Sequence, residues 1–413
     1  MQIYITGGFV RDKILNNTSH DKDYVVVGST IEEMLSLGFI KVGKTFPVFL
    51  HPTTKEEYAL ARKEIKTGKR HQDFEFIFTP DITLKEDSLR RDFTCNAIYE
   101  DITTGKLIDY HNGIKDIQNK ILRHISPHFK EDPLRLLRAC RFVATLNFTL
   151  APETVKICKQ MVEEGALSHL SKERIFQELE KSLCSPYFYR FIETARQIGL
   201  LKVLLPEVED LWQIPERADY HPEKNTGQHT ILALKSANSK DPITNLAILL
   251  HDIGKTKTDK THWPSHHHHE TLGIELAQDI LKRLDAPNLY KNFIPLAIEH
   301  HMIYHNFLEN NPQKLVNLCI KLAKHKRQSY YERFKVVINA DMHGRALPNF
   351  IKEEQEFENF IQEFDKYYNA SLLPKPKLIK NFSSLLEQLK NKELTKEDLT
   401  KIETKSIIEY VNS

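Results

Sequence analysis

The sequence predicts an α+β protein in which a small α/β head is followed by an elongated, all-helical body. Three observations lead to this prediction. Up to about residue 110, short β-branched and aromatic runs are separated by polar or helical pieces, as in a strand-rich domain. From about residue 131 onward, apolar residues recur at helical spacing. The length of 413 residues exceeds what one ordinary core supports, so we expect two or more domains.

The individual elements follow from the same patterns. In the head we predict strands at residues 2–6, 23–28, 47–52 and 57–62. In the body, helical periodicity is clearest at residues 173–183, 243–254 and 273–284. Polar stretches at 215–227 and 306–313 are predicted to be loops or boundaries, and Pro-Lys-Pro-Lys at 374–377 interrupts a Lys/Glu-rich helical tail.

Composition limits the classes of function. The formal charge is only +2, from 58 basic and 56 acidic residues, so a nucleic-acid surface must be a local patch. No apolar run approaches membrane-spanning length, and the N-terminus has no signal-peptide pattern. The five cysteines show no paired spacing, which favours reduced thiols in a cytoplasmic protein. The 20 histidines cluster between His221 and His305, which indicates a second kind of chemistry in the body.

A glycine pair follows the first predicted strand. Gly7 and Gly8 precede the helical segment that contains Arg11. Glycine lets the backbone approach a ligand closely, and backbone N–H groups at a helix start suit phosphate oxygens, which Arg11 could reach. A Gly pair also commonly marks nothing more than a tight turn.

Two aspartates one residue apart open the second predicted strand. In a strand, Asp21 and Asp23 would project from the same face, and their repulsion would be relieved by a cation. Oxygen ligands beside substrate phosphates suit Mg²⁺. Glu57 is a candidate third carboxylate. The alternative is a solvated turn, which a lone D-x-D pattern would favour.

The segment RRDFTCN at residues 90–96 concentrates polar side chains that suit phosphate and sugar. Arg90, Arg91, Asp92 and Asn96 lie in this short block, and arginine binds phosphate with two parallel hydrogen bonds. A basic surface helix is the simpler alternative.

The segment EDPLRLLRACRF at residues 131–142 predicts a helix with an arginine stripe. Asp132 before Pro133 is a typical helix start, so helix capping is the structural alternative for Asp132. Arg135, Arg138 and Arg141 fall at i, i+3 and i+6, opposite an apolar face. We expect these arginines to be unpaired within the protein and to need an anionic or nucleobase partner.

Histidines and aspartates in the body predict a metal site. His251 and Asp252 stand side by side at the end of an apolar helical run. Together with His229, His269, His301 and Asp341 they give the order H…HD…H…H…D. Imidazoles and carboxylates together suit a divalent transition metal, and Asp252 could bridge two ions. For His251 alone, a buried core histidine is the alternative. The run His266–His268 obscures the third ligand and could be a surface feature without a role.

Over nearly its whole length, the chain resembles the class II tRNA nucleotidyltransferases, in particular the bacterial multifunctional CCA-adding enzymes. The ordered motifs that carry the resemblance are GGFVRD (7–12), DKD (21–23), RRDFTCNAI (90–98), EDPLRLLRACRF (131–142) and ERIFQELEK (173–181). This resemblance implies a mixed or antiparallel head sheet and template-independent addition of CCA to the tRNA 3′ end from CTP and ATP. It implies that Asp21 and Asp23 are catalytic and hold Mg²⁺, and that Asp132 and Arg135 select the base. The remaining nucleotide-binding residues that it implies are Gly8, Arg11, Arg91, Arg138 and Arg141.

The body resembles the HD phosphohydrolase superfamily. The resemblance implies that His251 and Asp252 are catalytic and that His229, His251, Asp252, His269, His301 and Asp341 bind Ni²⁺ or another divalent transition metal. It also implies phosphatase, 2′-nucleotidase and 2′,3′-cyclic phosphodiesterase activities.

These interpretations divide the chain into a nucleotidyltransferase head (1–142), a helical neck for nucleobase and tRNA (143–225), an HD domain (226–345) and a helical tail (346–413). We expect tRNA, ATP and CTP as partners, no membrane, and a monomer or homo-oligomer. The tRNA surface should involve basic stretches of the body such as residues 325–335. The alternatives are a poly(A) polymerase or a CC- or A-specialised relative, an HD nucleotide hydrolase whose head only binds nucleotide, and an RNA-binding module without catalysis.

Overall fold

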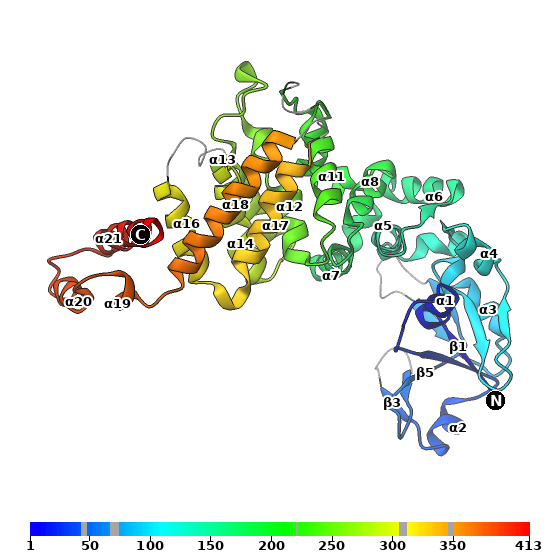
Figure 1. The fold of residues 1–413 in the computed structure, drawn as a ribbon. Helices are drawn as coiled ribbons and strands as arrows, with labels where there is room; N and C mark the ends of the chain where they lie inside the picture. The colour runs from blue at the N-terminus through cyan, green and yellow to red at the C-terminus, as the bar shows by residue number, and fades with distance from the viewer. Residues whose placement is uncertain (43–47, 67–73, 218, 220–221, 305–311, 346–350) are drawn as a thin grey trace. The chain divides into compact units, whose positions relative to one another are not determined.

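The computed structural model describes residues 1–42, 48–66, 74–217, 219, 222–304, 312–345 and 351–413. The chain divides into two compact units, one of residues 1–182 and 187–204 and one of residues 183–186 and 205–413. The predicted fold class is confirmed: a mixed sheet lies in the N-terminal head, and the later elements are helical (Figure 1).

The head is built on a seven-stranded sheet with the order β3-β4-β5-β2-β1-β8-β9. Its strands are β1 (Gln2–Thr6), β2 (Asp23–Val27), β3 (Ile40–Val42), β4 (Val48–Leu50), β5 (Glu57–Leu60), β8 (Ile98–Asp101) and β9 (Leu107–Asp109). Strands β2 and β5 are parallel, and the other neighbouring strands are antiparallel. The sequence predicts β1, β2, β4 and β5 but misses β3, β8 and β9, which are only three or four residues long.

The sheet places Asp23 beside the end of β1. Thr6 pairs with Asp23 across the β1–β2 ladder, so the turn at Gly7 begins next to the Asp23 carboxylate. On the faces of these strands, Tyr4 and Val25 pack with Tyr99 into the head core. Burial of these side chains therefore sets the register that brings the turn and the aspartate together.

The other elements of the first unit surround the sheet or extend beyond it. They are the hairpin β6 (Lys63–Lys66) and β7 (Phe74–Ile77), the short pair β10 (Ile121–Leu122) and β11 (Thr149–Leu150), and the helices α1 (Gly8–Ile14), α2 (Ile31–Ser36), α3 (Leu84–Leu89), α4 (Gly113–Gln118), α5 (Leu134–Leu146), α6 (Pro152–Glu163), α7 (Lys172–Leu183), α8 (Phe188–Gln197) and α9 (Leu201–Leu204). Within the described part of the chain, β11 is the only named strand after residue 142, as expected for a helical body.

The second unit is a set of packed helices. They are α10 (Pro206–Asp210), α11 (Thr226–Ala237), α12 (Pro242–Leu250), α13 (His269–Arg283), α14 (Asn288–His300), α16 (Pro312–Ala323), α17 (Tyr330–His343), α18 (Ile351–Ser371), α19 (Lys375–Leu378), α20 (Phe382–Lys390) and α21 (Lys396–Asn412). Helix α12 lies at the centre, with residues 243–250 all buried. It packs against α11, α14 and α17, and α16 packs against α18 and α21.

Three further predictions concern whole segments. The predicted loops at 215–227 and 306–313 lie partly outside the described residues. The five cysteines are all described and form no disulfide with one another. Among the described helices, none combines the length and apolarity that crossing a membrane requires.

Candidate functional site

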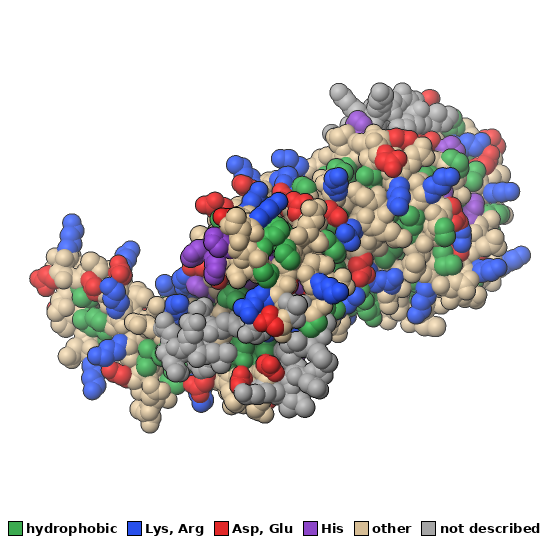
Figure 2. Space-filling view, turned by 90° about the horizontal axis from the view of Figure 1, so that it is seen from above, with side chains coloured by type: hydrophobic (Ala, Val, Ile, Leu, Met, Phe, Trp, Pro, Cys, Tyr) green, Lys and Arg blue, Asp and Glu red, His purple; other side chains and the backbone are tan. Residues whose placement is uncertain are grey.

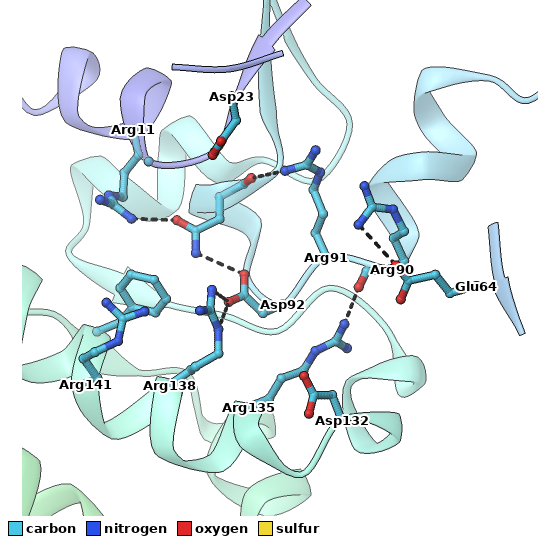
Figure 3. A pocket seen from close by; sticks show the side chains of 14 residues that line it. Arg11, Asp23, Glu64, Arg90, Arg91, Asp92, Asp132, Arg135, Arg138 and Arg141 are labelled. Carbon is cyan, nitrogen blue, oxygen red and sulfur yellow. Dashed lines mark hydrogen bonds and ion pairs between the residues drawn. The ribbon is translucent and has the colours of Figure 1, made fainter. Parts of the chain in front are cut away.

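The turn after β1 needs glycine at its first position. Gly7 has a φ of +75°, which side-chain-bearing residues rarely adopt, and a Cβ there would lie 3.4 Å from Asp23 Oδ2. Helix α1 begins directly at Gly8, and Arg11 lies on it. The turn therefore places Gly8, Arg11 and Asp23 around one cavity, as Figure 3 shows for Arg11 and Asp23.

The two aspartates differ in position, which corrects one prediction. Strand β2 begins only at Asp23, so Asp21 lies in the loop before the strand and not on the same strand face. Asp23 lines the cavity, whereas Asp21 is not among the lining residues. Partial desolvation raises the pKa of Asp23; Arg91 opposes this rise and the charge of Asp21 adds to it. The two carboxylates are thus within electrostatic range of each other although only one faces the cavity.

Glu64 is a cavity carboxylate that the sequence did not single out. Glu57 pairs in register with Asp23 between β2 and β5, but Glu64 on the β6–β7 hairpin lines the cavity. Glu64 accepts from Arg62 at 2.8 Å and from Arg90 at 3.5 Å. No local pattern marks Glu64, because the hairpin brings it to the cavity through tertiary packing.

Asp87 holds the two arginines of the RRDFTCN segment. The Arg90 Nε donates to Asp87 Oδ1 at 2.9 Å, and the Arg91 Nη2 and the Tyr99 hydroxyl lie 3.4 and 3.0 Å from Oδ2. Burial alone would raise the pKa of Asp87, but Arg90 and Arg91 hold it at about 2. The i, i+3 and i+4 spacing of Asp87, Arg90 and Arg91 is a signal by which the sequence could have shown this cluster.

Asp92 and Asn96 join the head to α5. Arg138 donates from Nε and Nη2 to Asp92 Oδ2 at 2.8 and 2.6 Å. Asn96 donates to Asp92 Oδ1 at 3.0 Å and accepts from Arg11 Nη1 at 2.8 Å. Burial opposes ionisation of Asp92, yet Arg138 and the Asn96 hydrogen bond hold its pKa at about 2. The chain of dashed contacts in Figure 3 follows this network from Arg11 to Arg138.

The expectation of three unpaired arginines on α5 is wrong. Besides the Arg138–Asp92 pair, the Arg141 Nε donates to Glu178 Oε2 on α7 at 2.6 Å. Arg135 donates to the carbonyl oxygens of His128 and Arg90. The acids and carbonyls come from distant segments, so the arginines look unpaired only when α5 is read by itself.

Asp132 makes a helix-capping contact and also lines the cavity. Helix α5 begins at Leu134, with Pro133 in the cap position, and the Asp132 side chain accepts from the Leu134 N–H at 3.0 Å. Asp132 also lines the cavity, and burial raises its pKa. A capping contact and a place in the cavity therefore coexist.

The resulting cavity of about 510 Å³ has the chemistry of an anion-binding site. It is lined by six arginines and four carboxylates: Arg11, Arg90, Arg91, Arg135, Arg138, Arg141, Asp23, Glu64, Asp92 and Asp132. Carboxylates hold several of these guanidiniums in fixed positions, and on the wall itself guanidiniums outnumber carboxylates. Such a wall suits a phosphate chain, and Asp23 at its edge suits a cation.

A second cluster lies in the other unit, where four imidazoles point inward. The Nδ1 atoms of His251, His269 and His301 lie 2.7–2.8 Å from the carbonyl oxygens of residues 248, 266 and 298. The Nδ1 of His229 lies 3.2 Å from Glu223 Oε1. These contacts place the Nδ1 proton on the outer side and leave each Nε2 for the centre, as in histidines that ligate metals.

The Nε2 atoms meet around Asp252 in two groups. Asp252 Oδ2 lies 3.2 Å from His251 and 3.9 Å from His229, and Asp341 Oδ1 lies 3.0 Å from His229. Asp252 Oδ1 lies 3.4 Å from His269 and 3.5 Å from His301. Two sets of ligand-type atoms lie close enough to share one ion: those of His229, His251 and Asp252, and those of Asp252, His269 and His301. The two sets share Asp252.

The histidine run resolves into separate environments. The two ring nitrogens of His266 lie 2.8 Å from the Thr258 hydroxyl and from the Pro215 carbonyl oxygen, so both are used in contacts within the protein. His267 and His268 are exposed, and Figure 2 shows histidine side chains gathered on the surface. Only His269 of this run joins Asp252. Gly254 makes this approach possible, because a Cβ there would overlap the His269 carbonyl oxygen.

The carboxylates around Asp252 favour a positive charge at the centre of this cluster. Burial lowers the pKa of His251, but Asp252 and Asp341 outweigh it and raise the pKa to about 10. Lys255, which the sequence did not single out, lies 2.8 Å from Asp252 Oδ2 and 2.7 Å from Glu216 Oε1. Lys255, Glu216 and His269 line an adjoining cavity of about 630 Å³. Buried carboxylates and inward-facing imidazoles together fit divalent transition metals.

Comparison with known proteins shows the family of the chain. Family models match residues 3–123 (poly A polymerase head domain), 147–211 (probable RNA and SrmB-binding site of polymerase A) and 226–325 (HD domain). A protein of Aliivibrio salmonicida named multifunctional CCA protein is 44% identical over 350 residues, which cover 84% of this chain and 86% of that protein. The chain belongs to the family of the multifunctional CCA proteins.

Solved structures agree with this family at the level of the fold. The CCA-adding enzyme of Bacillus stearothermophilus in complex with CTP is 23% identical, with a TM-score of 0.57 over 94% of this chain and 83% of that one. The Thermotoga maritima CCA-adding enzyme complexed with tRNA is 20% identical, with a TM-score of 0.56 over 88% and 78%. As a member of the multifunctional CCA proteins, the chain is a nucleotidyltransferase whose HD domain suggests a phosphohydrolase.

Proposed function

We propose that the head adds CCA to the 3′ end of tRNA without a nucleic-acid template, using CTP and ATP. The observation that carries this proposal is the cavity in which Asp23 faces the arginines of the RRDFTCN segment and of α5. The Aliivibrio relative is named for CCA, and the structural neighbours were solved with CTP and with tRNA. Both support the same substrates for this chain.

The proposal gives the arginines two different roles. Arg11, Arg91, Arg138 and Arg141 hold the triphosphate, since paired carboxylates or amides keep their guanidiniums in place before the nucleotide arrives. Arg135 reads the base with Asp132. The two carbonyl contacts of Arg135 use two of its five N–H donors and fix its plane, which leaves other donors for a base edge.

Asp21 and Asp23 supply the carboxylates of the proposed addition site. Mg²⁺ held by these oxygens would supply Lewis acidity for attack by the RNA 3′-hydroxyl and departure of pyrophosphate. Partial desolvation raises the pKa of Asp23 and the charge of Asp21 adds to the rise, and two neighbouring carboxylates gain from a shared cation.

For the HD domain, we propose hydrolysis of phosphate esters, including phosphatase, 2′-nucleotidase and 2′,3′-cyclic phosphodiesterase activity. His229, His251, Asp252, His269, His301 and Asp341 would hold Ni²⁺ or another transition metal, which supplies an activated water and a Lewis acid when bound. Lys255 is placed to orient Asp252 and to attract phosphate into the adjoining cavity. A tRNA that ends in a cyclic phosphate lacks a free 3′-hydroxyl, so this activity would prepare it for the head.

We propose that tRNA binds on the neck and the body. The basic stretch 325–335 contributes less than its composition suggests, because Arg333 pairs with Asp241 and Lys335 with Asp365. Lys326 and Arg327 are exposed and remain candidates for phosphate contacts.

The product ladder on a single tRNA tests the proposed addition. The protein is incubated with a tRNA that lacks its 3′ end, with CTP alone, ATP alone or both. We expect two additions with CTP alone and a third only when ATP is also present. A long ladder of added A residues would indicate a poly(A) polymerase. A stop after two additions, with both nucleotides present, would indicate a CC-adding enzyme. No extension at all would indicate a head that only binds nucleotide.

A further inference from the structure

We propose that Phe142 is a positioning residue that aligns three arginines of the nucleotide cavity through cation–π contacts. The guanidinium carbons of Arg11, Arg138 and Arg141 lie 5.3, 5.2 and 4.1 Å from the centroid of the Phe142 ring. Phe142 itself lines the cavity and is only 6% exposed. One aromatic ring thus serves guanidiniums from two different helices, α1 and α5.

The ring adds something that the polar partners do not supply. Arg11 donates a hydrogen bond to Asn96, Arg138 to Asp92 and Arg141 to Glu178, so each guanidinium has a different polar partner. A cation prefers the face of an aromatic ring because of the ring quadrupole, and exclusion of water strengthens this attraction. The shared ring therefore fixes the three guanidiniums relative to one another, which matters for a ligand that must bind all three.

A second aromatic ring packs against Phe142. Phe93 meets Phe142 edge-to-face at 5.6 Å and meets Phe129 at 5.5 Å, and all three rings are buried. Phe93 directly follows Asp92, the partner of Arg138. A tilt of the Phe142 ring would thus disturb the segment that anchors the same arginine.

This role rests on the proposed use of CTP and ATP and predicts a defined kinetic effect. The three arginines are proposed to hold the triphosphate, which the two nucleotides share, while Asp132 and Arg135 read the base. Weakening the ring contacts should therefore raise KM for CTP and ATP by similar factors. The choice between the nucleotides should not change, and kcat should change less than KM.

Fluorinated phenylalanines test the inference, since fluorine withdraws charge from the ring face with little change in shape. Mono-, di- and trifluorophenylalanine are placed at position 142 of the full chain, and CTP and ATP binding is measured by calorimetry beside KM and kcat. We expect a stepwise loss of affinity for both nucleotides, reaching about tenfold (about 1.4 kcal/mol) with three fluorines. Phe142→Leu, which keeps apolar packing without a ring face, should lose at least as much.

The same fluorine series at Phe188 is the matched control. Phe188 on α8 is buried, stacks with Phe191 and does not line the cavity, and among the described residues no cation lies over its ring. We expect the Phe188 series to leave nucleotide affinity unchanged, with circular dichroism confirming the fold of every variant. A flat series at Phe142, or an equal loss at Phe188, overturns the positioning role while the proposed function stands. A wild-type protein that binds neither nucleotide overturns the proposed function itself.

Discussion

Asp92 and Arg138 are 46 residues apart in the sequence and are joined by two hydrogen bonds to the same carboxylate oxygen, at 2.8 and 2.6 Å. Asp92 belongs to the polar segment after α3, and Arg138 belongs to α5. The pair therefore connects the segment that faces Asp23 with the helix that carries Arg135, one of the two proposed base-reading residues.

Substituting Asp92 should harm both stability and nucleotide addition. Asp92→Asn leaves Arg138 without its ionic partner in a mostly buried site, so we expect a stability loss of about 2–4 kcal/mol and at least tenfold slower addition. The control is Glu100→Gln, which removes the ion pair to the exposed Lys13 and should cost less than about 1 kcal/mol. Thermal melts by circular dichroism and initial rates of CTP incorporation measure the two effects. Equal behaviour of both variants would contradict the role of the pair.

Asp87 should make the stability of the head depend on pH in the acid range. Its pKa is about 2 in the folded protein and about 3.9 in unfolded chains. The ionised form therefore stabilises the fold above pH 4, by about 2 kcal/mol, and this contribution disappears as the pH falls through 2. We expect Asp87→Asn to melt below the wild type at pH 7, with a difference that shrinks between pH 4 and pH 2. Glu163→Gln, an exposed substitution on α6, should match the wild type throughout. A difference that stays constant with pH would rule out this linkage.

Arg135 and Arg138 should separate base choice from triphosphate binding. Arg135→Ala removes a base-edge partner and leaves Asp132 without it, so we expect the CTP-to-ATP preference to fall by about tenfold or more. Arg138→Ala should weaken both nucleotides by similar factors and keep the preference. Sequencing of products from mixed CTP and ATP measures the choice directly. Unchanged fidelity in the Arg135 variant would refute base reading by this residue.

Asp252 should be the ligand whose loss removes the most metal. Because its two oxygens face the two histidine groups, we expect Asp252→Ala to lose most Ni²⁺ after dialysis, while His269→Ala keeps the ion beside His229 and His251. His267→Ala is the control, since this side chain belongs to the same run but is exposed. Elemental analysis of the dialysed proteins gives the metal content. Loss of all metal from the His267 variant would place the site elsewhere.

The sequence predicts those parts that local patterns determine. Strands β1 and β2 follow from β-branched runs, and the HD constellation follows from residue types that rarely occur together for other reasons. The arginines of α5 were misjudged because their partners, Asp92 and Glu178, arrive through folding from segments 46 and 37 residues away. Glu64 and Lys255 were missed for the same reason, since nothing in the neighbouring sequence shows which cavity they line. Asp21 was expected to share a strand face with Asp23, but pairing with β1 starts only at Asp23.

The head and the HD domain are proposed to be two independent catalytic centres, and one substrate tests this directly. A tRNA lacking CCA and ending in a 2′,3′-cyclic phosphate is given to the wild type, Asp23→Ala and His251→Ala, with CTP and ATP. We expect the wild type to hydrolyse the cyclic phosphate and then the remaining phosphate monoester, and to add CCA to the freed 3′-hydroxyl. The Asp23 variant should free the 3′-hydroxyl without extension, and the His251 variant should leave the cyclic phosphate closed. The His251 variant should still extend a tRNA with a free 3′-hydroxyl at the wild-type rate. If either folded variant loses both activities, the two-centre account is wrong.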